Sequence, residues 1–258
     1  MEYQTISLSE EDGYATITLN RPDVLNALNT QMRAELLHAV NAAEKSARAI
    51  VLTGAGQAFC SGQDLGDRSS VGSADLERTL RDEYMPMLRA IFDCTIPTIA
   101  AVNGAAAGAG ANLALAADVV IAAESAVFLQ AFARIGLIPD AGGTYWLPRQ
   151  IGFARAMGAA LFAEPVPARK AAEWGMIWEA VPDKEFEAHW QSRVKKLAAG
   201  PTVAYGYIKE ALRSTYSNSL EEHLLVEAKL QGRCGKTRDF REGVLAFMEK
   251  RPAEYEGR

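Results

Sequence analysis

Apolar and polar side chains alternate near the start of the chain. Residues 14–19, YATITL, place alanine, isoleucine and leucine at every second position, with threonine between them. This period of two is typical of a strand with one buried face. The preceding Asp12-Gly13 pair is a strong signal for a two-residue turn, so the pattern predicts a β-hairpin.

A helical period follows. Met32, Leu36 and Val40 are spaced so that they fall on one face of a helix. Asn29 or Thr30 stands where the N-cap side chain of such a helix is needed. The spacing therefore predicts an amphipathic helix that begins near residue 30.

A second amphipathic helix is expected from about residue 73, where Ser73 can act as its cap. Pro86 lies inside this segment and is expected to kink or break the helix, because proline has no backbone N–H and its ring crowds the preceding turn. The apolar residues expected to face inward are Leu76, Leu80, Leu88 and Ile91.

Short apolar runs then alternate with helical segments. The runs are ARAIVLTGAG, PTIAAVNG and DVVIAAE, and a helix is expected to begin near Gly108, between the last two. Alternation of strands and helices favours an α/β fold with parallel strands.

From about Pro165 onward the pattern is mostly helical. The best marked helix is SLEEHLLVEAKLQG, with Ser219 and Glu222 as a capping box and Gly232 as the stop. We expect an α/β core followed by a helical C-terminal extension.

The composition is that of an ordinary globular protein. The chain has 258 residues, 49% of them hydrophobic and 23% charged, and this is enough for a sizeable core. A net charge of −5 argues against a surface for nucleic acid or for an anionic membrane. We expect no secretory signal at the N-terminus. Three cysteines without a CxxC spacing favour reduced thiols in a cytoplasmic protein, and no metal site is expected.

Residues 103–124, NGAAAGAGANLALAADVVIAAE, carry very little side-chain bulk. A membrane span would have about this length. However, Asn103-Gly104 marks a turn, and Asp118 places a charge inside the run. A backbone that must be approached closely by a ligand is the alternative interpretation.

Glycines recur at three points where strands are expected to end: TGAGQAFCSGQDL, NGAAAGAGANLALA and GLIPDAGGTYWLP. None of them matches the GxGxxG or GxxxxGK[ST] phosphate-binding patterns. A helix that begins near Gly108 would expose N–H groups without internal partners. With a second donor from CSGQDL, they would form an oxyanion hole around one ligand oxygen. Close packing of helix on strand explains the same glycines equally well.

Six motifs occur together in the chain: RPDVLNALN, AFCSGQDL, AAVNGAAAGAGANLALAADVVIAAESAVF, GLIPDAGGTYWLPRQIG, AAEWGMIWEAV and REGVLAFMEKR. In this order and spacing, the chain resembles the crotonase (enoyl-CoA hydratase/isomerase) superfamily along nearly its whole length. The resemblance implies the crotonase (ClpP-like) fold, a spiral of ββα turns, over residues 1–200, with a site for a CoA thioester. It implies a helical segment for trimerisation over residues 201–258, which also acts as a lid over CoA.

In that family the carbonyl of a CoA thioester lies between two backbone N–H groups, which stabilise the enolate formed when the α-carbon loses a proton. By motif position, these catalytic donors are Gln63 and Ala109. The substrate-binding residues that the resemblance implies are Val24, Leu25, Ala27, Ala58, Ser61, Gly62, Asp64, Leu65, Gly108, Phe132, Tyr145 and Lys250. Lys250 is expected at the CoA phosphates, of its own or of a neighbouring subunit, with a solvated lysine as the alternative.

Hydratases of the family use two glutamates to add water across a double bond. This chain has Asn112 and Phe132 at those motif positions, and neither side chain exchanges a proton at neutral pH. It has Asp140 where hydratases typically carry glycine. A carboxylate between apolar neighbours is expected to have a raised pKa and to move a proton.

One carboxylate suffices to shift a double bond, so the resemblance implies an acyl-CoA isomerase with Asp140 as proton shuttle. GQDLGDR, GLIPDAGGTYWLPR, EWGMIW and REGVLAFMEKR are particularly similar to the branch that converts ring-1,2-epoxyphenylacetyl-CoA to oxepin-CoA in phenylacetate degradation. That branch also shifts 3-enoyl-CoA to 2-enoyl-CoA. A fatty-acid Δ3,Δ2-enoyl-CoA isomerase, a hydratase-like enzyme and a non-catalytic binding protein of the same fold are the alternatives. An aryl-CoA dehalogenase would need a histidine that residues 73–94 lack.

Several further residues have structural as well as functional interpretations. Phe128, Phe132, Tyr145 and Trp146 are candidates for the wall of an aromatic pocket or for core packing. Asp64 and Asp118 are expected to fix loop and helix ends, and Trp174 and Trp178 to lie in the core. The family implies an acyl-CoA substrate and a homotrimer or dimer of trimers, with no nucleic-acid or membrane partner. No cofactor is expected, because coenzyme A is part of the substrate.

Overall fold

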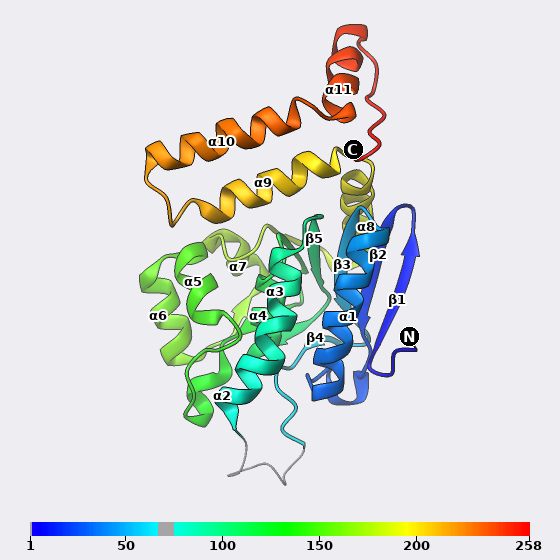
Figure 1. Cartoon of the computed structure of the whole chain (residues 1–258). Coiled ribbons are helices and arrows are strands. Elements are labelled where there is room, and N and C mark those ends of the chain that lie inside the picture. Colours follow the sequence, from blue (N-terminus) through cyan, green and yellow to red (C-terminus); the bar gives the residue numbers. More distant parts are fainter. Residues whose placement is uncertain (1, 67–74) are drawn as a thin grey trace.

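The computed structural model describes residues 2–66 and 75–258, which form two sheets covered by helices (Figure 1). The larger, six-stranded sheet has the order β1-β2-β3-β5-β7-β10. Its strands are β1 (Ile6–Glu11), β2 (Tyr14–Leu19), β3 (Ala49–Gly54), β5 (Thr98–Val102), β7 (Val119–Ala123) and β10 (Glu179–Val181). The smaller sheet has the order β4-β6-β8-β9. Its strands are β4 (Ala58–Cys60), β6 (Ala105–Ala107), β8 (Val127–Leu129) and β9 (Val166–Pro167).

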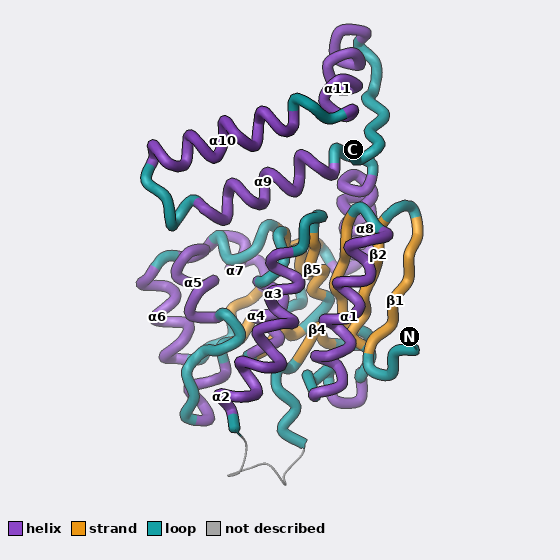
Figure 2. Tube along the Cα trace, in the orientation of Figure 1, coloured by secondary structure: helices purple, strands orange, loops and turns teal. Residues whose placement is uncertain are grey.

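The helices of the described residues lie around and beyond these sheets (Figure 2). They are α1 (Thr30–Ser46), α2 (Leu76–Thr79), α3 (Met85–Asp93), α4 (Ala109–Leu115), α5 (Gly143–Ile151), α6 (Phe153–Phe162), α7 (Ala168–Trp174), α8 (Asp183–Ala198), α9 (Thr202–Ser214), α10 (Leu220–Cys234) and α11 (Arg238–Glu249).

The predicted N-terminal hairpin is confirmed. β1 and β2 pair antiparallel from Ile6 opposite Leu19 to Glu11 opposite Tyr14. Asp12 and Gly13 between the strands have φ values of 47° and 78°. Positive φ at both central residues fits the right-handed twist of the strands, and asparagine, aspartate and glycine tolerate it best.

The predicted parallel pairing is also confirmed, and it has a repeating form. β2, β3, β5, β7 and β10 are parallel neighbours in the larger sheet, and β4, β6 and β8 are parallel in the smaller one. Each of β3, β5 and β7 is followed along the chain by one strand of the smaller sheet and then by a helix. The chain therefore advances in ββα turns.

Both faces of the larger sheet are buried, as expected of parallel strands. On one face, Ile50 and Leu52 belong to the main core with the predicted helix face of α1. On the other face, Val51 packs in a second cluster with Phe186 and Trp190 of α8. Asn29 is the N-cap of α1, because its side chain accepts from the Met32 N–H.

The helix expected after residue 73 differs from its prediction. Ser73 lies outside the described residues, and the Asp75 side chain caps α2 by accepting from Arg78 N–H. Residues Leu80–Tyr84 form a π-helical turn that joins α2 to α3, with Pro86 in the first turn of α3. The prediction for Leu76 was wrong, since it is 48% exposed. The predictions for Leu88 and Ile91 are confirmed, since both are buried.

The C-terminal segment is helical, as predicted; α9 lies against the core, and α10 and α11 lie farther from the sheets (Figure 1). The capping box of Ser219 and Glu222 at the start of α10 is present. Gly232 is not the stop, because α10 continues to Cys234 and is capped by Gly235. Trp178 is 68% exposed, so its assignment to the core was wrong, whereas Trp174 packs half-buried against the main core.

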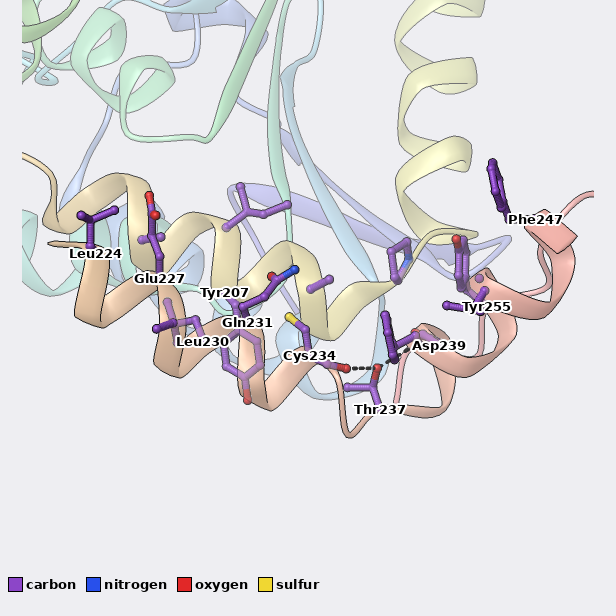
Figure 3. Close-up of a pocket in the computed structure, with 18 residues that line it drawn as sticks. Tyr207, Leu224, Glu227, Leu230, Gln231, Cys234, Thr237, Asp239, Phe247 and Tyr255 are labelled. Atoms are coloured by element: carbon purple, nitrogen blue, oxygen red, sulfur yellow. Dashed lines mark hydrogen bonds between the residues drawn. The ribbon is translucent and has the colours of Figure 1, made fainter.

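An apolar groove of about 960 Å³ runs between α9, α10 and α11 (Figure 3). Tyr207, Leu230 and Phe247 are among its lining residues, and none of the predicted site residues lines it. Among the helices of the described residues, none is both long and apolar enough to span a bilayer.

Candidate active site

Two loops that follow the paired strands β4 and β6 bring the predicted oxyanion-hole residues together. Gly62 follows β4, and Ala109 follows β6. A Cβ placed on Gly62 would lie 2.8 Å from the carbonyl oxygen of Ala107 and 3.4 Å from the amide nitrogen of Ala109. Gly62 also has a φ of +95°, a conformation that residues with a side chain rarely adopt. This position therefore requires glycine, because its φ is positive and a Cβ would clash with the carbonyl of Ala107.

The amide of Gln63 is oriented by its neighbours. Leu28 N–H donates to the carbonyl of Gly62 at 2.8 Å, and Asp64 N–H donates to the carbonyl of Leu28 at 3.1 Å. Leu28 and Gln63 thus form a parallel bridge, in which the N–H of Gln63 itself points away from Leu28. Within the described residues, no hydrogen bond is recorded for this N–H.

The amide of Ala109 is the first of helix α4. Gly108 is the N-cap, and its carbonyl accepts the first helical bond, from Asn112 N–H, at 3.2 Å. The N–H groups of the first turn consequently have no partner within the helix. Ala109 is only 4% exposed, so this candidate donor is largely shielded from water.

The small residues around this loop serve two purposes. A Cβ on Gly104 would lie 2.0 Å from the carbonyl of Gln57, and one on Gly110 would lie 2.3 Å from the carbonyl of Cys60. These two glycines allow close packing against β4 and the turn before it. Gly62 and Gly108, in contrast, flank the two candidate donors. The close-packing interpretation is therefore confirmed for Gly104 and Gly110, and the oxyanion-hole interpretation stays a prediction for the loops of Gly62 and Gly108.

Asp140 lies in a tight turn that leads into α5. Its carbonyl accepts from Gly143 N–H at 2.8 Å. The next residue, Ala141, has a φ of +47°, a strained value for a residue with a Cβ. The carboxylate oxygen Oδ1 of Asp140 is buried, and it has no hydrogen-bond partner among the described residues. Burial without a partner raises the pKa of Asp140 to about 6.

Asn112 fastens the Asp140 turn to helix α4. Its side chain is fully buried, and its Nδ2 donates to the Asp140 carbonyl at 2.7 Å. Its Oδ1 accepts from Gln130 Nε2 at 2.9 Å. The amide at this position is therefore engaged in holding the turn. Phe132, the residue at the second glutamate position, is 6% exposed, and its Cζ would lie 3.7 Å from a Cβ on Gly108.

The side chain of Gln63 is held by residues that the sequence analysis did not single out. Its Oε1 accepts from Tyr84 Oη at 2.5 Å and from Arg33 Nη1 at 3.0 Å. Arg33 also forms an ion pair with Glu83 at 2.6 Å. Arg33 and Tyr84 lie in helical segments far from Gln63 in the chain, so no local motif could have indicated the contact.

The predicted CoA-binding residues lie next to the Gln63 loop. Ser61 N–H donates to the Leu25 carbonyl at 2.9 Å, and Ser61 Oγ lies 3.3 Å from the Val24 carbonyl. Val24 and Leu25 are 43% and 48% exposed. Ala27 and Ala58 are buried. The segment 24–27 is therefore packed directly on the loop that carries Gln63.

Asp64 and Leu65 extend this loop outward. Asp64 pairs with Arg21 at 2.7 Å and accepts from Gly66 N–H at 2.9 Å. The bond from Gly66, followed by that from Arg21, lowers the pKa of Asp64. The structural role expected for Asp64 is thus confirmed, and Leu65 is 63% exposed beside it.

Two more of the predicted substrate-binding residues, Tyr145 and Lys250, lie on helix α5 and at the end of helix α11. Tyr145 on α5 packs edge-on against Trp146, with ring centroids 4.8 Å apart, and the Arg149 guanidinium lies 3.6 Å from its ring centroid. Phe128 is buried in the main core. Lys250 ends α11, which stands beyond α9 and α10 from the sheets (Figure 1). The fold of one chain therefore does not bring Lys250 to the Gln63 and Ala109 loops.

A sequence model for the family described as enoyl-CoA hydratase/isomerase matches residues 9–258. The chain belongs to the enoyl-CoA hydratase/isomerase family. It is 61% identical over 258 residues to a Rhodobacter capsulatus protein named "Probable enoyl-CoA hydratase", with all of both chains covered. It is 46% identical over 253 residues to the 1,2-epoxyphenylacetyl-CoA isomerase of Escherichia coli, with 96% of this chain and 97% of that one covered.

Solved structures of family members show the same fold. The crystal structure of an enoyl-CoA hydratase from Bacillus anthracis superposes with a TM-score of 0.91 at 32% identity, and it covers 99% of this chain and 100% of its own. The crotonase fold that the sequence implied is thereby confirmed.

Proposed function

We propose that this family member is an acyl-CoA isomerase that moves a double bond by one-carboxylate proton transfer. The observation that carries the proposal is the state of Asp140. Its Oδ1 is buried without a partner among the described residues, and its pKa is raised to about 6. A carboxylate with this pKa is mostly ionised at pH 7, yet it is a stronger base than a solvated aspartate.

The proton path follows from three groups. Asp140 takes a proton from C2 of a 3-enoyl thioester, and the electron pair moves to the thioester oxygen. The N–H groups of Gln63 and Ala109 donate to that oxygen and stabilise the dienolate, each contributing about 3 kcal/mol in the transition state. The protonated Asp140 then returns the proton at C4, so that the double bond lies between C2 and C3 and the aspartate is ionised again.

The residues at the two glutamate positions of the family disfavour hydration. Water addition in this family needs a second acid–base group, and Asn112 and Phe132 occupy the two glutamate positions. Asn112 is also fully buried, and its side chain forms hydrogen bonds with Gln130 and with the Asp140 carbonyl. The 61% relative is nonetheless named a hydratase, so hydration is the second candidate that the experiment must separate.

The name of one relative supports a particular acyl group for the substrate. The E. coli relative is named for 1,2-epoxyphenylacetyl-CoA, and we propose ring-1,2-epoxyphenylacetyl-CoA, converted to oxepin-CoA, as the aromatic substrate of this chain. A short 3-enoyl-CoA is the second substrate class. No cofactor is proposed beyond the coenzyme A that the substrate carries.

The test follows the ultraviolet absorbance of the conjugated thioester. Wild-type protein with a 3-enoyl-CoA is expected to increase this absorbance, because conjugation forms, and Asp140→Asn is expected to lower kcat on the order of 10³-fold. The same protein with a 2-enoyl-CoA separates the candidates, because hydration removes conjugation. Rapid loss of absorbance with the 2-enoyl substrate, and no gain with the 3-enoyl one, would overturn the isomerase proposal.

Asp118→Asn is the matched control for this substitution. It makes the same chemical change in another largely covered aspartate, whose side chain is 16% exposed. Its kcat is expected to equal that of the wild type at a temperature where it remains folded. Equal losses in both variants would mean that Asp140 acts on folding and not on the proton.

A further inference from the structure

The side chain of Gln63 faces a buried network, while its backbone N–H is the candidate oxyanion donor. Its Oε1 receives two hydrogen bonds, from Tyr84 Oη at 2.5 Å and from Arg33 Nη1 at 3.0 Å. Tyr84 and Arg33 are each only 3% exposed. Two bonds to one atom from two buried donors fix the side chain of a residue whose loop position is otherwise at the surface.

Arg33 ties together both sides of the bridge that orients Gln63. Its Nη1 also donates to the carbonyl of Leu28 at 2.8 Å, and Leu28 is the bridge partner of Gln63. Its remaining nitrogens donate to Glu83 Oε2, at 3.1 Å from Nε and 2.6 Å from Nη2. The guanidinium carbon lies 4.7 Å from the centroid of the Tyr84 ring. The charge of Arg33 is thus paired with Glu83, and its guanidinium group bonds to both residues of the bridge, Leu28 and Gln63.

The π-helical turn supplies two members of this network. Glu83 and Tyr84 are the last two residues of the turn Leu80–Tyr84, directly before α3. Successive residues of a regular α-helix point about 100° apart, and a π-helical turn changes this spacing locally. Such turns are rare and occur frequently at functional sites. Here the turn lets adjacent side chains reach Arg33 and Gln63 together.

We propose that Arg33, Glu83 and Tyr84 are positioning residues that hold the Gln63 N–H in the oxyanion hole through the Gln63 side chain. This inference rests on the proposed function, because it assumes that the Gln63 N–H donates to the thioester oxygen. The network fixes where the donor points. A positioning role predicts that loss of the network lowers kcat and leaves KM nearly unchanged.

The test is a double-mutant cycle between Tyr84→Phe and Gln63→Met. Tyr84→Phe removes one hydroxyl, and Gln63→Met keeps the chain length and the backbone N–H but removes the Oε1 acceptor. We expect each to lower kcat about tenfold, less than the 10²–10³-fold that the loss of a whole donor costs. The double variant is expected to lose no more than Gln63→Met alone. A double variant whose loss is the product of the single losses would overturn the inference.

A second readout does not depend on turnover. Butanoyl-CoA carrying ¹³C at the thioester carbonyl has no double bond to move, and the infrared frequency of its carbonyl reports the hydrogen bonds that it accepts. Wild-type protein is expected to lower this frequency, and Tyr84→Phe and Gln63→Met to reverse part of that shift. A shift in the wild type that both variants preserve would overturn the positioning role and leave the oxyanion hole intact. No shift in the wild type would overturn both.

Tyr14→Phe is the matched control. Tyr14 is 1% exposed, and its hydroxyl donates to Glu11 Oε1 at 2.7 Å, in the N-terminal hairpin. The variant therefore loses a comparable hydrogen bond from a buried tyrosine. Its kcat and the infrared shift of the butanoyl-CoA carbonyl are expected to match those of the wild type. Should Tyr84→Phe fail to fold, Gln63→Met carries the test, because Gln63 lies in an exposed loop.

Discussion

The side chains of Asp118 and Asp140 differ in their hydrogen bonds and ion pairs. The Asp118 side chain accepts from both the N–H and the hydroxyl of Thr98, at 2.8 and 2.9 Å, and it forms ion pairs with Lys209 and Arg213 at 2.6 Å. The Oδ1 of Asp140 is buried, and no described residue bonds to it. A covered carboxylate with every oxygen engaged joins parts of a structure, whereas one left without a partner is available for chemistry.

The two surroundings differ because different elements build them. Lys209 and Arg213 lie on α9, so Asp118 joins the C-terminal segment to the turn before β7. Among the described residues, Asp140 is held through its backbone alone, by Asn112 and Gly143. The fold thus fixes the position of Asp140 while its side chain stays unpaired among the described residues. The predictions below test this difference.

Asp118→Asn is expected to have the largest effect on stability, a loss of about 3 kcal/mol. The side chain of Lys209 is 8% exposed, and the variant leaves its ammonium without the carboxylate. Urea unfolding at pH 7.5 measures the change. The variant Asp118→Asn/Lys209→Met removes both charges and should recover part of the loss. A single-variant loss below about 1 kcal/mol would mean that Asp118 is an ordinary surface ion pair.

The value of kcat/KM is expected to follow the ionisation of Asp140 as the pH changes. The base must be ionised, and the pKa of Asp140 is raised to about 6. As the pH falls through 6, the protonated fraction rises, so kcat/KM should fall tenfold per pH unit below that point. Incubation at pH 5 followed by assay at pH 7.5 controls for unfolding. A flat profile from pH 5 to pH 8 would contradict the assignment of Asp140 as base.

Much of the fold could be predicted from local signals. The Asp12-Gly13 turn, the Asn29 cap and the Ser219 capping box each depend on a few adjacent residues, and all are present. The failures depend on distant packing. Gly232 does not end α10, since helices tolerate a glycine in open space, and Trp178, in the bend before β10, is exposed.

The candidate site could be predicted only in part. Asp140 and the Gly62 and Gly108 loops were found from motifs that lie within single segments. The unpartnered state of Asp140 Oδ1 depends on every neighbour at once, and no pattern along the chain contains it. The bonds from Arg33 and Tyr84 to Gln63 join three distant segments, one of them through a π-helical turn that hydrophobic spacing does not indicate.

The smallest expected effect is a gain in stability from Asp140→Asn, the variant that should lose the activity. Burial raises the pKa of Asp140 from about 4 in the unfolded chain to about 6 in the folded one. The folded state therefore binds the proton more tightly, and ionisation destabilises it as the pH rises through this window. At pH 8 the neutral amide should stabilise the fold by about 1 kcal/mol, which raises Tm by about 2–4 °C in a chain of this size. As the pH falls from 6 toward 4 the wild-type carboxylate becomes protonated, so the gain should fade. Thermal unfolding at pH 8 and pH 4 measures both values, with Asp118→Asn expected to lose stability at pH 8. A gain from Asp140→Asn that persists at pH 4 would show that the carboxylate charge is not its cause.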